Sequence, residues 1–248
     1  MALIDVERAV LSVCFESEPP EAALRALGDR RRWLVYRELA RDRLLREIQF
    51  ALPRSCAALG EARLAHAFAT HLDRDPPRTR YFREVVLAFA ASAIETLRSE
   101  PPSDLPSHSF DLLRYEAALW EVSDLETTTA PGVVEFAFDR VPVVSPALRL
   151  LEVAHAVHIP AGTEGSCAPG EFWLCVQLDP VECRSRTWSF NRTTYALLAE
   201  FQRAERSATE AVQHIAAQLG RRVTPEFVDR LCGSLAQWIE VGILLGSR

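Results

Sequence analysis

The sequence contains no lysine, because all 28 of its basic residues are arginine. This excludes the Schiff-base lysine, the lysine of the phosphate-binding P-loop and the serine–lysine dyad as sources of catalysis. A glycine-rich phosphate loop is also missing, since the 10 glycines are scattered. Gly162 and Gly165, which stand close together in PAGTEG, belong to an expected surface loop. No phosphate-binding or lysine-based enzyme is therefore predicted.

Long apolar runs are missing as well. The longest apolar block, VVLAFAASAI, is about half the length that a helix needs to cross a bilayer. The N-terminal sequence MALIDVERAV carries acids where a secretory signal peptide would carry positive charge. We therefore expect a cytoplasmic protein that makes no membrane contact.

The six cysteines are widely separated and form no CxxC motif or Cys/His pair of zinc-site spacing. We interpret them as reduced and mostly buried thiols. His155 and His158 in AHAVH have a spacing that some metal ligands share. In a β-strand, however, residues three apart point to opposite faces. We expect no metal and no cofactor in this chain.

The run RRRWLVYRELARDRLLREI, from Arg30 to Ile48, is rich in arginine and suggests a nucleic-acid site. The net charge of −6 argues against a global field that attracts a polyanion. Several arginines of the run also have an acid three or four residues away, such as Asp42 before Arg46. Four basic residues remain as a predicted surface for an acidic partner protein: Arg30, Arg31, Arg32 and Arg37.

Up to about Leu125, apolar residues recur at intervals of three and four, which predicts helices separated by proline-rich breaks. Five helices are expected: Leu3 to Phe15, Arg31 to Leu52, Glu61 to Leu72, Tyr81 to Arg98 and Phe110 to Leu125. In the second of these, the side expected to face the core holds Val35, Leu39, Leu45, Ile48 and Leu52. We predict a helical bundle domain over residues 1–129.

The pattern changes at ETTTAPG, and β-rich runs follow it. They are Val133 to Asp139, Leu150 to Ile159, Phe172 to Leu178 and Arg184 to Phe190. Three helices come next, with expected caps at Asn191, Ser207 and Thr224. The sequence thus predicts an α+β fold, in which residues 130–248 form a winged-helix-like domain of short strands and three helices.

The last predicted strand is a candidate binding element. In ECRSRTWSF neither face is cleanly apolar, which is typical of an edge strand. Such a strand can accept an incoming peptide by β-augmentation, although an ordinary sheet edge explains the pattern equally well. The predicted peptide-binding residues are Arg184, Arg186 and Trp188 of this strand, with Phe227, Leu231, Leu235 and Trp238 of the last helix.

The sequence also offers features of two other classes of function. A winged-helix-like domain also suits a DNA-binding transcriptional regulator, but the last helix sets Glu226, Asp229 and Glu240 against the single base Arg230. A hydrolase could be built on His108 in PSHSFD or on the two histidines of AHAVH. No GxSxG motif accompanies either, so catalysis ranks last.

Short motifs also suggest a family. The stretches VYRELARDRLLREIQFALPRSCAALG, RDPPRTRYFREVVLAFAASAIETL and LPSHSFDLLRYEAALWEV contain Tyr36-Arg37, Leu52-Pro53, Leu59-Gly60, Pro76-Pro77, Phe89 and Glu116. In these features the first half resembles the N-terminal domain of the HvfC/BufC proteins, a family once described as DNA-binding. The strands and helices of the second half, ending in WIEVGILL, resemble precursor-recognition modules of the PqqD type. The chain departs from the family after Tyr36-Arg37, where Glu38 and Leu39 replace a common asparagine.

The resemblance implies a non-catalytic partner of a multinuclear non-heme iron oxidase. Such oxidases are TIM-barrel enzymes that modify cysteine-containing residues of ribosomally made peptides in methanobactin-type and bufferin-type biosynthesis. By similarity, this chain would pair with the oxidase, hold the leader of the precursor peptide and present its core to the iron. Iron is then expected only in the oxidase, and a DNA-binding regulator remains the alternative.

Overall fold

A computed structural model describes residues 2–79, 81–99, 101–123, 125, 132–179, 181–203 and 205–248. The chain divides into two compact units, residues 1–120 and 121–248. The first unit is helical and the second combines helices with antiparallel strands, so the predicted α+β class is confirmed. The predicted boundary near residue 130 falls within residues 126–131, which lie outside the described part of the chain.

The described helices of the N-terminal part begin with a short hairpin and continue as a bundle. They are α1 (Leu3–Phe15), α2 (Glu21–Leu27), α3 (Arg30–Ala51), α4 (Pro53–Leu59), α5 (Glu61–Arg74), α6 (Phe82–Ser99) and α7 (Ser109–Val122). All five predicted helices are present, and the bounds of α1 agree with the prediction. The helices α2 and α4 were not predicted. Pro53 was expected only to end α3, but it is also the first residue of α4, where its missing N–H costs nothing.

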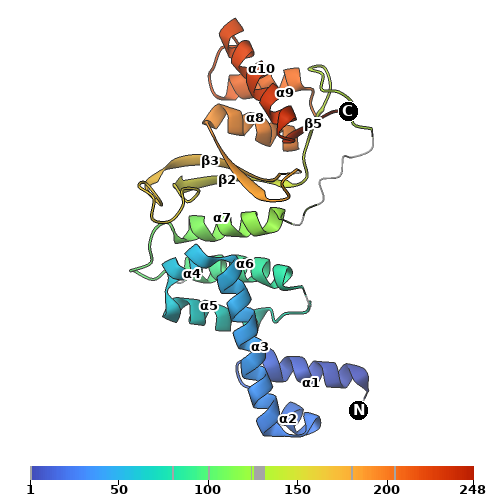
Figure 1. The fold of residues 1–248 in the computed structure, drawn as a ribbon, viewed down its shortest axis with the longest axis vertical. Coiled ribbons are helices and arrows are strands. Elements are labelled where there is room, and N and C mark those ends of the chain that lie inside the picture. The colour runs from blue at the N-terminus through green and yellow to red at the C-terminus, as the bar shows by residue number, and fades with distance from the viewer. Residues whose placement is uncertain are drawn as a thin grey trace. The chain divides into compact units, whose positions relative to one another are not determined.

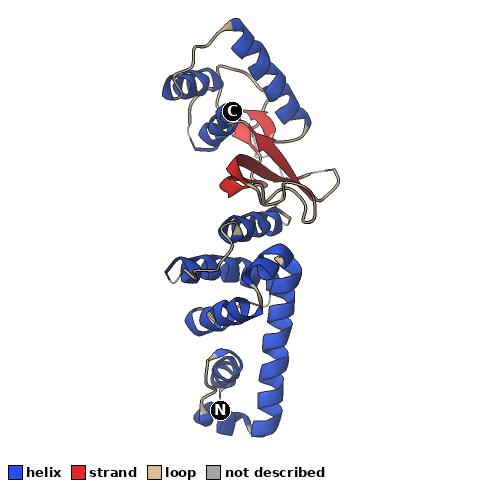
Figure 2. Ribbon diagram, turned by 90° about the vertical axis from the view of Figure 1, so that its left-hand side faces the viewer, coloured by secondary structure: helices blue, strands red, loops and turns tan. Residues whose placement is uncertain are grey.

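The long helix α3 changes its neighbours along its length. Its N-terminal half packs against α1 and α2, and its C-terminal half packs against α4 and α6 (Figure 2). In the C-terminal half, Leu44 and Ile48 join the core that α4, α5 and α6 complete. The prediction that Val35 and Leu39 face the core is wrong, because they are 50% and 62% exposed.

Two arginines, rather than Val35 and Leu39, occupy the side of α3 that faces α1. Arg37 donates hydrogen bonds from its two terminal nitrogens to the carbonyls of Val13, at 2.6 Å, and Ser17, at 2.9 Å. Arg41 donates to the carbonyl of Glu16 at 3.3 Å. The last carbonyls of a helix have no partner within that helix. The two guanidinium groups therefore bind the end of α1 and the turn after it to α3.

The second unit contains two small antiparallel sheets. One has the order β2 (Leu148–His155), β3 (Pro169–Leu178) and β4 (Ser185–Phe190), and the other pairs β1 (Pro142–Val144) with β5 (Leu244–Ser247). Three of the four predicted strands are confirmed, while β1 and β5 were missed.

The predicted strand at Val133–Asp139 is wrong. Within it, only Val134 forms a bridge, with Ser247 of β5. The backbones approach so closely here that a Cβ on Gly246, at φ +142°, would lie 2.1 Å from the carbonyl oxygen of Val134. Only glycine fits such a position, so this pairing depends on a residue more than a hundred positions away and has no local signature.

Three helices lie on one face of the three-stranded sheet: α8 (Arg192–Arg203), α9 (Ala208–Gln218) and α10 (Pro225–Glu240) (Figure 1). The three predicted caps are confirmed. The side chain of Asn191 accepts from the N–H of Thr194 at 2.9 Å, Ser207 forms a capping box with Glu210, and Thr224 caps α10. In the described part of the chain, no helix is long and apolar enough to cross a membrane.

Candidate functional site

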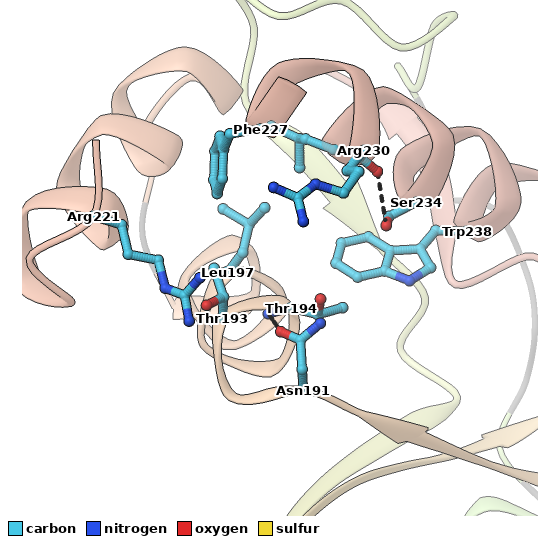
Figure 3. Close-up of a pocket in the computed structure, with 10 residues that line it drawn as sticks. Asn191, Thr193, Thr194, Leu197, Arg221, Phe227, Arg230, Ser234 and Trp238 are labelled. Atoms are coloured by element: carbon cyan, nitrogen blue, oxygen red, sulfur yellow. Dashed lines mark hydrogen bonds between the residues drawn. The ribbon is translucent and has the colours of Figure 1, made fainter. Parts of the chain in front are cut away.

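A groove of about 500 Å³ opens between α8 and α10 (Figure 3). The start of α8, the loop before α10 and one side of α10 supply its walls. The lining residues are Asn191, Thr193, Thr194, Leu197, Arg221, Phe227, Arg230, Leu231, Ser234 and Trp238. The volume is within the range of about 300–1,000 Å³ that is typical of ligand sites.

The floor of the groove is apolar and rigid. Leu197, Leu231 and Trp238 are buried, and they belong to the same core cluster as the sheet residue Leu148. The ring of Trp238 packs against that of Phe190, with centroids 5.8 Å apart. Because these side chains also hold the second unit together, the shape of the floor is set by the fold.

Polar groups line the upper part of the groove. Arg221 comes from the loop before α10, and Arg230 comes from α10 itself (Figure 3). The Nε of Arg230 donates to the backbone carbonyl of Glu226 at 3.1 Å, which orients its side chain. The hydroxyl of Ser234 donates to the carbonyl of Arg230 at 3.1 Å. This rim provides hydrogen-bond donors above an apolar floor.

The groove begins where the edge strand β4 ends. Among the described residues, β4 pairs only with β3, so its second edge has no strand partner. The pairing runs from Leu178 opposite Ser185 to Trp173 opposite Phe190. Phe190 is followed directly by Asn191, which lines the groove. A sheet edge without a strand partner and a side-chain groove thus lie next to each other.

The side chains predicted to bind a peptide from β4, and from Arg184 just before it, do not line the groove. Arg186 forms ion pairs with Asp179 and Glu182, both at 2.9 Å, and Arg184 pairs with Glu182. Trp188 donates from Nε1 to the side-chain oxygen of Gln177 at 3.1 Å and packs against the core. Their positions leave the backbone edge of β4, rather than its side chains, as the part that could bind.

Three of the four predicted residues of α10 line the groove. Phe227, Leu231 and Trp238 line the groove together, as expected. Leu235 does not line it and is 2% exposed within the core. Arg230 and Ser234 also line the groove but were not predicted, because the charges of α10 were compared for the whole helix and not for each of its faces. Helical periodicity puts both on the side of Phe227 and Trp238, and this signal could have found them.

Three of the four arginines predicted to bind a partner have local contacts. Arg30 forms an ion pair with Glu21 at 3.2 Å, Arg32 pairs with Asp29 at 3.3 Å, and Arg37 binds the end of α1. The expectation that these three are unpaired is therefore wrong, and Arg31 is exposed. The sequence reading missed the exposed apolar residues of this helix: Val35, Tyr36, Leu39 and Phe50.

The thiols and histidines that suggested other chemistry are mostly structural. Burial raises the pKa of Cys56 and of Cys175 to about 12, and the Glu116 carboxylate contributes at Cys56. Such thiols are poor nucleophiles near neutral pH. His155 ends β2, and the ring of His158 stacks near that of Phe172, with centroids 5.4 Å apart. Within the described ranges, no group of three or more His, Cys, Asp or Glu residues could hold a metal ion.

A comparison of the sequence with models of known protein families and with curated proteins finds no match.

Proposed function

We propose that this chain is a non-catalytic subunit that binds the leader of a ribosomally made precursor peptide and presents the peptide to an iron-dependent oxidase. The observation that carries the proposal is the position of β4 at the edge of its sheet, beside the groove between α8 and α10. In this proposal, the sheet β2-β3-β4 with the three helices acts as a winged-helix-like recognition module.

The geometry suits an extended peptide. A peptide that pairs with β4 gains backbone hydrogen bonds along a strand of six residues, about 20 Å at the usual rise per residue. Its alternate side chains point to one face of the sheet, where they can enter the groove. The backbone edge would provide affinity, and the groove would provide selectivity among peptides.

The oxidase half of the proposal rests on the resemblance to the HvfC/BufC proteins. It is supported by the exposed apolar side chains of α3, because exposed apolar clusters often mark protein interfaces. We assign the docking of the oxidase to Val35, Tyr36 and Leu39, with the exposed Arg31 beside them. Any iron would belong to the oxidase, so this chain would supply binding and orientation only.

Hydrogen exchange tests the peptide half. The leader of a precursor peptide encoded beside this gene is added to the intact chain, and amide exchange is followed by mass spectrometry. Binding by β-augmentation predicts slower exchange in β4, because its outer amides gain partners. The strand β2, the other edge of the same sheet, is the internal control. Equal exchange of β4 with and without peptide contradicts the proposal.

Reconstitution tests the presentation half. A neighbouring oxidase is assayed on its precursor peptide with this chain, without it, and with a Leu39→Glu variant. The expected result is modification that requires the chain and is weakened by the variant. An oxidase that works equally well alone rules the presentation role out. Salt-sensitive binding of duplex DNA without peptide binding would instead support the regulator alternative.

A further inference from the structure

The groove between α8 and α10 combines positive charge with an apolar floor. Its described lining contains two arginines, Arg221 and Arg230, and no acidic side chain. The whole chain, by contrast, has a net charge of −6. The groove is thus a positively charged part of an acidic protein, which favours a negatively charged ligand.

The two guanidinium groups converge. In Figure 3 both point toward Leu197 on the floor, one from the loop before α10 and the other from α10. Other arginines of the second unit already have carboxylate partners: Arg149, Arg184, Arg186, Arg206 and Arg248. Among the described residues, no ion pair is found for Arg221 or Arg230. Arg230 lies near Glu226 and, after the hydrogen bonds to that carboxylate, helps to lower its pKa. Neither arginine has an acidic partner in the lining of the groove, so both can bind a carboxylate from outside.

Two of the three acids of α10 stand on a different side of the helix. Helical spacing puts Phe227, Leu231 and Trp238 together, with Arg230 at the border of this face. It puts Asp229 and Glu240 on the outer side and Glu226 one turn before Arg230, and none of the three acids lines the groove. The outer side disfavours a polyanion such as duplex DNA, while the groove itself favours a single carboxylate.

We propose that the groove selects peptides in which an acidic side chain stands two residues from a bulky apolar side chain. This inference rests on the proposed peptide binding at β4. In an extended peptide, residues two apart point to the same face. The carboxylate would bind between Arg221 and Arg230, since arginine binds carboxylates through paired hydrogen bonds. The apolar side chain would contact Phe227, Leu231 and Trp238.

The test begins with a displayed library of random dodecapeptides, selected on the intact chain. The expected result is enrichment of Asp or Glu two positions from Leu, Phe or Trp. The best peptide is then labelled and its affinity measured by fluorescence polarisation, beside a version with Asn for Asp or Gln for Glu. We expect the neutral version to bind about tenfold more weakly, the usual scale for loss of one charge-assisted pair.

Variants of the chain complete the experiment. Arg221→Gln and Arg230→Gln should each weaken the acidic peptide about tenfold and remove the preference for it over the neutral version. Arg222→Gln is the matched control, because Arg222 is an exposed neighbour that does not line the groove. All three positions are exposed, and thermal melts followed by circular dichroism should confirm that each variant folds.

The outcomes separate this inference from the proposed function. Selected peptides without an acid at that spacing, or Arg221 and Arg230 variants that bind like the wild type, overturn the selectivity and leave peptide binding intact. A library that yields no binder overturns both. A further arm uses labelled duplex DNA: if the same variants lose DNA binding while no peptide binds, the groove is a nucleic-acid site and the inference is wrong.

Discussion

The hydroxyl of Ser55 on α4 donates a hydrogen bond of 2.6 Å to the carboxylate of Glu116 on α7. The same carboxylate accepts from the backbone N–H of Ser55 at 2.8 Å and from that of Arg54 at 3.0 Å. Glu116 is 5% exposed, so a buried carboxylate binds the N-terminus of a short helix. This contact joins α4, which begins at Pro53, to α7.

Glu116→Ala should destabilise the first unit strongly, because it leaves three donors without their acceptor. We expect a loss of about 3 kcal/mol in the free energy of unfolding, and about 1 kcal/mol for Ser55→Ala. Urea denaturation of the intact chain measures both. Glu95→Ala, at an exposed position of α6, is the control and should stay within about 0.5 kcal/mol of the wild type. Equal effects at Glu116 and Glu95 would contradict this role.

The sequence could predict the features that local chemistry determines. The capping box at Ser207 and Glu210 is one, because both partners stand within one helical turn. The contact between Ser55 and Glu116 joins residues 61 positions apart, and no local sequence pattern predicts it. For the same reason the groove could be predicted from α10, through Phe227 and Trp238, but its wall on α8 could not.

The arginine-rich helix α3 shows how a periodic pattern can mislead. An apolar stripe normally marks the buried side of a helix. Here the buried side near α1 holds Arg37 and Arg41, whose guanidinium groups satisfy the carbonyls at and just beyond the end of α1. The apolar Val35 and Leu39 are left at the surface. Counting local acid partners could not show this, since the acceptors are backbone carbonyls twenty or more residues away.

Arg37→Ala should therefore loosen α1 rather than weaken only a binding surface. It removes two hydrogen bonds from a charged donor, and we expect a loss of about 2 kcal/mol in local stability. Hydrogen exchange of peptides from α1 measures this loss. Arg31→Ala is the matched control on the same helix, and it should leave the exchange of α1 unchanged. If both variants behave alike, Arg37 does not hold α1 to α3.

The buried thiols predict a response to alkaline pH. The pKa of Cys56 and that of Cys175 are raised to about 12 in the folded chain, chiefly by burial, from the ordinary value of 9.0. Their contribution to stability is fully present below pH 9.0, and it is lost as the pH rises toward 12. Urea denaturation across this interval should show the decline, and a Cys56→Ala variant should show a smaller one.

Alkylation gives an independent measurement of the same thiols. At about pH 8, iodoacetamide should modify the exposed Cys183 and Cys232 of the native chain and spare Cys56 and Cys175. Mass spectrometry of the digested protein identifies the modified residues. In urea, all six cysteines should react, which is the control for reagent access. Rapid labelling of Cys56 in the native chain would show that the core of the first unit opens.

His71 predicts a response to acid. It is 1% exposed in α5, its ring packs edge-on against that of Phe89 with centroids 5.9 Å apart, and its Nδ1 has no hydrogen-bond partner among the described residues. Burial lowers the pKa of His71 below 6.5, although Asp75 acts in the opposite direction. Since the unfolded chain then binds the proton more readily, the stabilisation is present above pH 6.5 and is lost as the pH falls.

The comparison of two leucine variants isolates this effect. Between about pH 7.5 and about pH 5, the wild type should lose more stability to urea than His71→Leu does, because only the wild type carries the buried imidazole. His66→Leu changes an exposed histidine of the same helix and should keep the wild-type response. If His71→Leu loses as much stability as the wild type over this interval, then the acid sensitivity of the first unit arises from groups other than its buried histidine.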